Sequence, residues 1–120
     1  MPNKFDACVL LVEDNDQVRD FTHEVLNDLG CTVLLACDAS QAIAQLETNS
    51  VDVVITDVVM PGMSGIELAD EISKRWTDVP VILATGYSDE LVAKRPQYPS
   101  IAKPFNSAQL QEALGLALAR

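Results

Sequence analysis

Five apolar runs of strand length recur along the sequence and constrain its fold more than any other feature. They cover residues 7–12, 32–37, 51–56, 80–85 and, more weakly, 100–102. Each run is nearly continuous and does not alternate apolar with polar residues, a pattern typical of strands that are covered on both faces. The sequence therefore predicts five strands of a parallel sheet.

Segments with a helical period separate these runs. The residues expected on the buried faces of the helices are Val18, Phe21, Val25 and Leu29, then Ile43 and Leu46, then Leu68, Ile72 and Trp76, and finally Leu110, Ala113, Leu114, Ala117 and Leu118. Gly30 is expected to close the first helix in a left-handed conformation. Asp38 and Gln41 predict a capping box, and Asn106 can cap the last helix. A fourth helix before Pro96 must be short, about two turns, because proline interrupts a helix.

This alternation predicts an α/β fold, an open and doubly wound five-stranded parallel sheet with right-handed crossovers. In such sheets ligands bind beyond the carboxyl ends of the strands. Glu13 and Asp14 follow the first run, Asp57 follows the third, Thr85 ends the fourth and Lys103 follows the fifth. We therefore expect these five side chains to gather along one edge of the sheet.

Length, charge and cysteine content restrict the class of protein. A chain of 120 residues predicts a single domain. Its net charge of −10 argues against direct nucleic-acid binding, which depends on Lys and Arg, and suits divalent cations or basic partner surfaces. No apolar run approaches the roughly 18 residues of a membrane span, and no signal-peptide pattern is present, so a cytoplasmic protein is expected. Cys8, Cys31 and Cys37 are expected to be buried, reduced thiols.

The acids expected at the sheet edge predict a particular chemistry. Two carboxylates about 4 Å apart repel each other by roughly 4 kcal/mol at an effective dielectric constant near 20, so such a cluster either takes up a proton or binds a cation. Hard oxygen ligands without His or Cys favour Mg²⁺. A carboxylate beside the cation can also attack phosphorus and form an aspartyl-phosphate. Lys103 would then offer a positive charge, and Thr85 a hydroxyl, to the phosphoryl oxygens.

Four motifs together resemble the receiver domains of two-component response regulators. They read LLVEDND, DVVMPGMSG, LATGYS and AKPF, and the resemblance covers about residues 6–118 of a domain taken as 1–120. The resemblance implies a flavodoxin-like (βα)5 fold with strand order 2-1-3-4-5. It also implies that Asp57 accepts a phosphoryl group from a phosphohistidine on a histidine kinase or a histidine phosphotransfer protein.

The resemblance assigns roles to the remaining residues of the edge. It implies that Asp14, Asp57 and the backbone carbonyl of Val59 bind Mg²⁺, with Glu13 acting through a metal-bound water. Thr85 and Lys103 would contact the phosphoryl group, and the peptide bond between Lys103 and Pro104 would be cis. Residues Val59 and Tyr87 would tune the access of water to the phosphoryl group, and their side chains predict slow hydrolysis.

One position departs from the family pattern. Many members place Tyr or Phe three residues before the conserved Lys, where it moves with the Thr on phosphorylation; here that residue is Ser100, and Tyr98 lies two residues earlier. The usual pairing of Thr and aromatic residue is therefore in question. The face made by the fourth helix, the fifth strand and the last helix, which is the common dimer surface of the family, could support a homodimer.

Several alternatives stay open at this point. The chain could be a receiver excised from a hybrid histidine kinase, because ATGYSDE followed by KPF is similar to such receivers. A Mg²⁺-dependent phosphohydrolase with an Asp nucleophile would need an acid at position 59, where this chain has Val. A nucleotide- or flavin-binding domain would need a glycine-rich loop after the first strand, and VEDNDQV has none. The last alternative is an inactive receiver that only binds partners.

Overall fold

The computed structural model describes residues 5–86 and 98–119. The strands are β1 (Cys8–Val12), β2 (Thr32–Ala36), β3 (Val53–Asp57), β4 (Val81–Thr85) and β5 (Ser100–Ala102). The helices in the described part of the chain are α1 (Asp16–Asp28), α2 (Ala39–Thr48), α3 (Gly65–Arg75) and α5 (Ser107–Leu118). The fourth helix expected before Pro96 lies outside the described residues.

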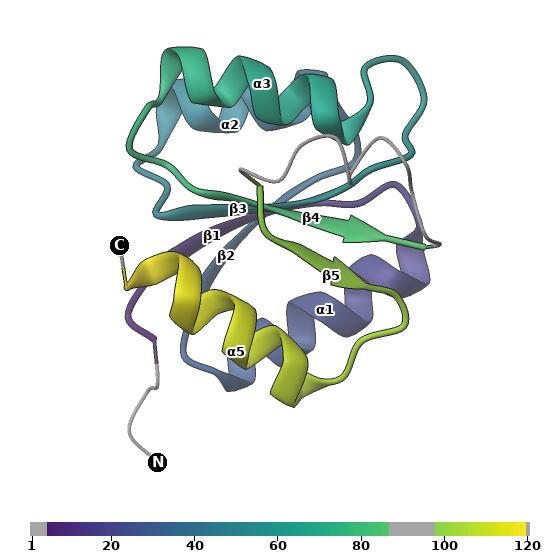
Figure 1. The fold of residues 1–120 in the computed structure, drawn as a ribbon, viewed down its shortest axis with the longest axis vertical. Coiled ribbons are helices and arrows are strands. Elements are labelled where there is room, and N and C mark those ends of the chain that lie inside the picture. The colour runs from purple at the N-terminus through teal and green to yellow at the C-terminus, as the bar shows by residue number, and fades with distance from the viewer. Residues whose placement is uncertain (1–4, 87–97, 120) are drawn as a thin grey trace.

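The five strands form one parallel sheet in the order β2-β1-β3-β4-β5. This order confirms the predicted flavodoxin-like, doubly wound architecture. Helices α2 and α3 cover one face of the sheet, and α1 and α5 cover the other (Figure 1). Because all strands are parallel, their carboxyl ends meet at one edge, which is where the acidic residues were expected to gather.

Burial explains why the strand sequences are nearly continuous in apolar residues. In the central strands β1, β3 and β4 almost every residue is buried, whereas the outer strands β2 and β5 are partly exposed. Successive side chains of a strand point to opposite faces, so a central strand needs apolar residues at every position. The predicted strand boundaries agree with the observed ones to within two residues.

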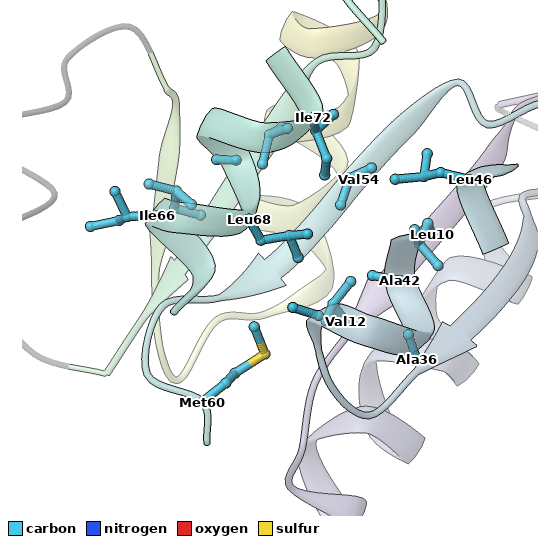
Figure 2. Packing of buried hydrophobic residues seen from close by; sticks show 14 of the residues in the cluster. Leu10, Val12, Ala36, Ala42, Leu46, Val54, Met60, Ile66, Leu68 and Ile72 are labelled. Carbon is cyan, nitrogen blue, oxygen red and sulfur yellow. The ribbon is translucent and has the colours of Figure 1, made fainter. Parts of the chain in front are cut away.

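Two apolar clusters occupy the two sides of the sheet. Figure 2 shows the cluster between the sheet and the α2–α3 layer, where Leu10 and Val54 of the strands lie among Leu46, Leu68 and Ile72 of the helices. The second cluster lies on the α1–α5 side. It includes Val9, Leu11, Leu26, Ile82, Leu110 and Leu114. The core therefore holds the sheet from both sides and leaves its carboxyl edge open for polar residues.

Polar side chains cap the starts of all four described helices. The N-caps are Asn15, Asp38, Ser64 and Asn106, and each accepts a hydrogen bond from a backbone amide in the first helical turn. Complete capping boxes form at α3 and α5, where Glu67 and Gln109 complete the pairs. Such caps satisfy amides that would otherwise lack a partner within the helix.

The capping box predicted for α2 is only half formed. Asp38 accepts a hydrogen bond from the amide of Gln41 at 2.8 Å, as expected. The Gln41 side chain, however, accepts from the amide of Cys37 at 2.8 Å. Its oxygen thus reaches one residue further back than the N-cap.

The predicted buried face of α1 was wrong at Phe21, which is 49% exposed. Leu29 is buried and Val25 packs against the second cluster, as predicted. Thr22 and Leu26 are buried as well. Thr22 can be buried because its hydroxyl donates to the carbonyl oxygen of Val18 at 2.8 Å, which removes the cost of an unpaired polar group. The expected end of the helix is confirmed, since Gly30 has a φ of 93°.

The cysteines only partly meet the expectation of buried thiols. All three are free; Cys31 is buried, Cys8 is partly buried and Cys37 is exposed. The prediction for Cys37 was wrong because β2 ends at Ala36, and Cys37 starts the turn into α2. None of the helices in the described part of the chain is long and apolar enough to cross a membrane.

Candidate functional site

Three acidic side chains meet at the carboxyl edge of the sheet. Glu13 and Asp14 directly follow β1, and Asp57 is the last residue of β3. One carboxylate oxygen from each lies within 4.8 Å of the others. Glu13 is only 2% exposed and Asp57 is partly buried, while Asp14 is exposed. The fold therefore brings together the three acids that the sequence placed at two strand ends.

Lys103 is the cation of this pocket. Its ammonium lies 2.7 Å from a carboxylate oxygen of Glu13 and 3.1 Å from one of Asp57. The side chain is mostly buried, so the two ion pairs are less screened by solvent than surface pairs. Lys103 is followed by a cis peptide bond to Pro104, in agreement with the expectation. One cation is thus shared between two of the three acids.

Burial and charge both shift the pKa values of this pair. Burial raises the pKa of the Glu13 carboxyl and the charge of Asp57 adds to the rise, whereas hydrogen bonds from Lys103 and from the amide of Asn15 oppose it. Burial acts to lower the pKa of the Lys103 ammonium, but the hydrogen bond to Glu13 and the charges of Asp57 and Glu13 outweigh it and raise that pKa. Lys103 therefore stays protonated at neutral pH.

Thr85 lies between the phosphoacceptor candidate and the lysine. It is the buried last residue of β4, and its carbonyl oxygen accepts from the amide of Lys103 at 2.6 Å. On the other side of β4, the carbonyl oxygen of Ala84 accepts from the amide of Val58 at 3.2 Å. The end of β4 therefore sets the spacing between the ends of β3 and β5.

The turn after Asp57 requires glycine at two positions. Gly62 has a φ of 77°, a conformation that residues with a side chain rarely adopt. Gly65 begins α3, where its amide donates to the carbonyl oxygen of Val58 at 2.8 Å. A Cβ atom at Gly65 would overlap with the carbonyl of Asp57 and lie 2.9 Å from the Cα of Val58. The start of α3 therefore packs directly on the backbone of Asp57.

Arg19 was not among the site residues predicted from the sequence. Its guanidinium donates to the backbone carbonyl oxygen of Glu13 at 3.0 Å and to the carboxylate of Asp16. A signal was present, because Arg19 is the only Lys or Arg between Lys4 and Lys74 and lies among acids. That signal alone does not say whether such an arginine pairs with a side chain or with the backbone.

The remaining residues named in the sequence analysis lie around the pocket or further from it. Val59 is 76% exposed beside the pocket, and Tyr87 lies outside the described residues. Ser100 is exposed. Tyr98 donates to a carboxylate oxygen of Asp70 at 2.7 Å, and its hydroxyl lies 3.1 Å from that of Ser73. Tyr98, which precedes β5, is thus hydrogen-bonded to α3.

The donor set of this pocket fits a hard divalent cation. It consists of carboxylate oxygens, with no His or Cys ligand among the three grouped residues. Mg²⁺ prefers such oxygen ligands and retains several waters, so one or two direct carboxylates suffice. A carboxylate held between a cation and Lys103 can act as a nucleophile toward phosphorus while positive charge surrounds the phosphoryl oxygens.

Comparisons with known proteins define the class. The sequence model of the response regulator receiver domain matches residues 9–115. A solved signal receiver domain of an HD domain-containing protein from Pseudomonas fluorescens Pf-5 superposes with a TM-score of 0.89 at 31% identity, covering 96% of each chain. The Vibrio cholerae chemotaxis protein CheY4 has a TM-score of 0.88 at 28% identity, covering 95% of this chain and all of CheY4. The chain belongs to the response regulator receiver domain family.

Curated relatives include proteins of two kinds. The sensor kinase CckA of Brucella abortus is 36% identical over 110 residues, which are 87% of this chain and 12% of the kinase. The transcriptional regulatory protein YrkP of Bacillus subtilis is 37% identical over 108 residues, which are 85% of this chain and 45% of that protein. The chain thus spans less than half of the length of these two relatives.

Proposed function

We propose that this receiver domain accepts a phosphoryl group on Asp57 from a phosphohistidine of a histidine kinase or a histidine phosphotransfer protein. The observation that carries the proposal is the contact of Asp57 with Lys103 at 3.1 Å inside the group of three acids. In the proposal Asp14, Asp57 and the carbonyl of Val59 hold Mg²⁺, and Glu13 acts through water. The bound cation would offset the negative charge of the phosphoryl oxygens.

The transfer step follows from the residues around Asp57. A carboxylate oxygen of Asp57 attacks phosphorus, the bond from phosphorus to the imidazole nitrogen breaks, and that nitrogen keeps the electron pair. Lys103 contacts the Asp57 carboxylate and can follow the charge onto a phosphoryl oxygen. Thr85, at the end of the neighbouring strand, would donate its hydroxyl hydrogen to another phosphoryl oxygen. The domain then acts by positioning and by charge neutralisation.

Slow hydrolysis of the phosphoryl group belongs to the same proposal. Val59 is exposed beside the pocket and carries no acid or amide that could orient a water. A phosphohydrolase would need such a group for efficient turnover. We therefore propose a phosphorylated signalling module that loses its phosphoryl group slowly by itself, and not an efficient enzyme.

A groove beside the pocket supports a macromolecular phosphodonor. The groove has a volume of about 430 Å³ and is lined mainly by apolar atoms, with Phe21 and Val18 of α1 on one side and Pro104 and Phe105 on the other. Lys103 is also part of its lining. An apolar helix face that carries a phosphohistidine could pack on Phe21 and reach Asp57 from there. Phe21→Ala should then slow transfer from a phosphohistidine protein and leave transfer from a small acyl phosphate unchanged.

The decisive experiment is phosphorylation by a small acyl phosphate with MgCl₂, followed by intact mass spectrometry. We expect one phosphoryl adduct that is stable in acid and labile in base. Asp57→Asn should remove it, while Asp20→Asn, which changes the same charge on exposed α1 surface, should retain it. The absence of an adduct with any donor would favour an inactive receiver that only binds partners.

The wider context of the domain also remains a proposal. We take residues 1–120 as one receiver domain that works in the cytoplasm, with no direct nucleic-acid contact. The similarity to part of a sensor kinase makes a hybrid histidine kinase a candidate parent protein. A homodimer through the fourth helix, β5 and α5 stays a prediction, because residues 87–97 lie outside the described part of the chain. Sedimentation of the domain with and without the acyl phosphate would test it.

A further inference from the structure

Arg19 is held in an unusual position for a helix arginine. It lies in the first turn of α1, yet its side chain is only 15% exposed. The terminal nitrogen Nη1 of the guanidinium donates to the backbone carbonyl oxygen of Glu13 at 3.0 Å, and Nη2 donates to the carboxylate of Asp16. An arginine offers this pair of donors in a rigid planar fork, so both contacts constrain each other.

The contact acts on the peptide group that joins Glu13 to Asp14. The amide of Glu13 donates to the carbonyl oxygen of Ala36 in β2 at 3.0 Å, so β2 holds the Glu13 backbone on one side. Arg19 holds the carbonyl on the other side. Because the plane of this peptide group sets where the chain leaves β1, it also sets where Asp14 places its carboxylate relative to Asp57.

We propose that Arg19 is a positioning residue that fixes the β1–α1 turn and thereby sets the affinity of the acidic pocket for Mg²⁺. The inference rests on the proposed function of that pocket. Among the described residues, Arg19 makes hydrogen bonds to the Glu13 carbonyl and the Asp16 carboxylate and not to Asp14 or Asp57, so it acts through the backbone of Glu13. Groups that hydrogen-bond to metal ligands typically change metal affinity by about 10- to 100-fold when they are removed, and we expect the lower end of this range for a contact with the backbone.

The positive charge of Arg19 and its positional restraint have opposite effects on the affinity for Mg²⁺. A positive charge near the pocket repels a cation, so its removal alone would tighten Mg²⁺ binding. The carboxylate of Asp16 already neutralises much of this charge. Loss of the positional restraint would weaken binding instead. The sign of the change in the dissociation constant therefore separates the two effects.

The experiment measures the dissociation constant of Mg²⁺ by titration calorimetry with MgCl₂ on the whole chain. Arg19→Gln removes both the charge and the fork, and Arg19→Lys keeps the charge but loses the fork. Arg75→Gln is the matched control, because it removes the same charge from the end of α3, where Arg75 pairs with Glu47. We expect Arg19→Gln to weaken binding about 10-fold, Arg19→Lys to weaken it less, and Arg75→Gln to leave it unchanged or slightly tighter.

Thermal unfolding in EDTA accompanies each titration. A purely structural role of Arg19 would lower the melting temperature and leave the Mg²⁺ dissociation constant of the folded protein unchanged. An unchanged or smaller dissociation constant in Arg19→Gln would overturn the inference. If Arg19→Gln does not fold, Arg19→Lys decides: weaker binding supports the inference, and parental affinity overturns it. If the parent chain itself binds no Mg²⁺, the proposed function fails and the inference fails with it.

Discussion

At the scale of single residues, the pocket depends on a few side chains that cannot be replaced without loss. Gly65 is one of them, because its missing side chain lets the start of α3 rest on the backbone of Asp57. Lys103 is another, because it is paired with two acids at once. In both cases the residue type follows from the geometry at the edge of the sheet.

Gly65→Ala should destabilise the domain and displace Asp57. The added Cβ would overlap with the Asp57 carbonyl, and forcing a methyl group into a packed position typically costs about 1–3 kcal/mol. Urea unfolding measures this loss, and the rate of phosphorylation by an acyl phosphate should fall as well. Gly115→Ala is the control, because its site has open space within α5; it should gain about 0.5–1 kcal/mol from helix propensity. Equal effects of the two substitutions would contradict the account.

The Lys103 ion pairs predict a loss of stability at high pH. The pKa of Lys103 is raised in the folded state above its ordinary value of 10.5, so the folded state holds this proton more tightly than the unfolded state does. The resulting stabilisation is complete below the unfolded pKa and disappears as the pH rises through the folded pKa. Urea unfolding from about pH 9 upward should show a steeper fall in the parent than in Lys103→Met. Parallel curves would argue against the ion pairs as the cause.

At the scale of elements, β5 is bound at both of its ends. Lys103 follows it and contacts the acidic pocket, while Tyr98 precedes it and contacts Asp70 and Ser73 of α3. The strand itself has three residues and pairs only with β4 among the described strands. Its place in the sheet is therefore supported by these flanking side chains as well as by its hydrogen bonds to β4.

Tyr98→Phe should loosen the start of β5 without touching the pocket. The substitution removes the hydrogen bond to the Asp70 carboxylate, and a bond to a charged partner contributes about 1.5–3 kcal/mol. We expect a loss of stability of that order in urea, together with faster amide exchange at Leu83, whose amide donates to Pro99. Ser73→Ala leaves the Asp70 contact in place and should cost less. If Tyr98→Phe is as stable as the parent, the contact with α3 does not hold the strand.

Elements differ in how far the sequence could predict them. The central strands were predictable because burial on both faces demands continuous apolar runs. The face of α1 was predictable only in part, because Phe21 is apolar yet exposed, and Thr22 is polar yet buried with its hydroxyl bonded to the helix backbone. The acids and Lys103 could be placed at one edge from topology alone, but the sharing of Lys103 between Glu13 and Asp57, and the contact of Arg19 with a carbonyl, depend on side-chain conformations that no pattern records.

At the scale of the whole molecule, charge opposes the folded state. The chain has a net charge of −10, and three acids meet in one pocket. Any cation that binds only the folded form stabilises it by mass action. The burial of the apolar clusters thus outweighs the repulsion between like charges. A cation bound in the pocket would reduce the part of this repulsion that arises among the three acids.

MgCl₂ should therefore raise the melting temperature more than NaCl of equal ionic strength. At a Mg²⁺ concentration ten times the dissociation constant, the expected gain is about 1.4 kcal/mol. Asp14→Asn should melt higher than the parent in EDTA, because one of three mutually repelling charges is gone, and should show no specific gain with MgCl₂. Asp20→Asn, on the exposed surface of α1, should respond to MgCl₂ like the parent. Scanning calorimetry of the parent and the two variants measures these changes, and equal responses of the parent to the two salts would contradict a cation site.

The shortness of β5 has a consequence for how a signal could leave the pocket. A strand of three residues is too short to absorb a displacement of the residues at its ends. In the proposed phosphorylation of Asp57, the ammonium of Lys103 would move toward a phosphoryl oxygen, and β5 would pass that shift on to Tyr98, whose hydroxyl is hydrogen-bonded to Asp70 of α3. The change at the aspartate would then be transmitted from the carboxyl end of β5 to its amino end, where Tyr98 meets α3.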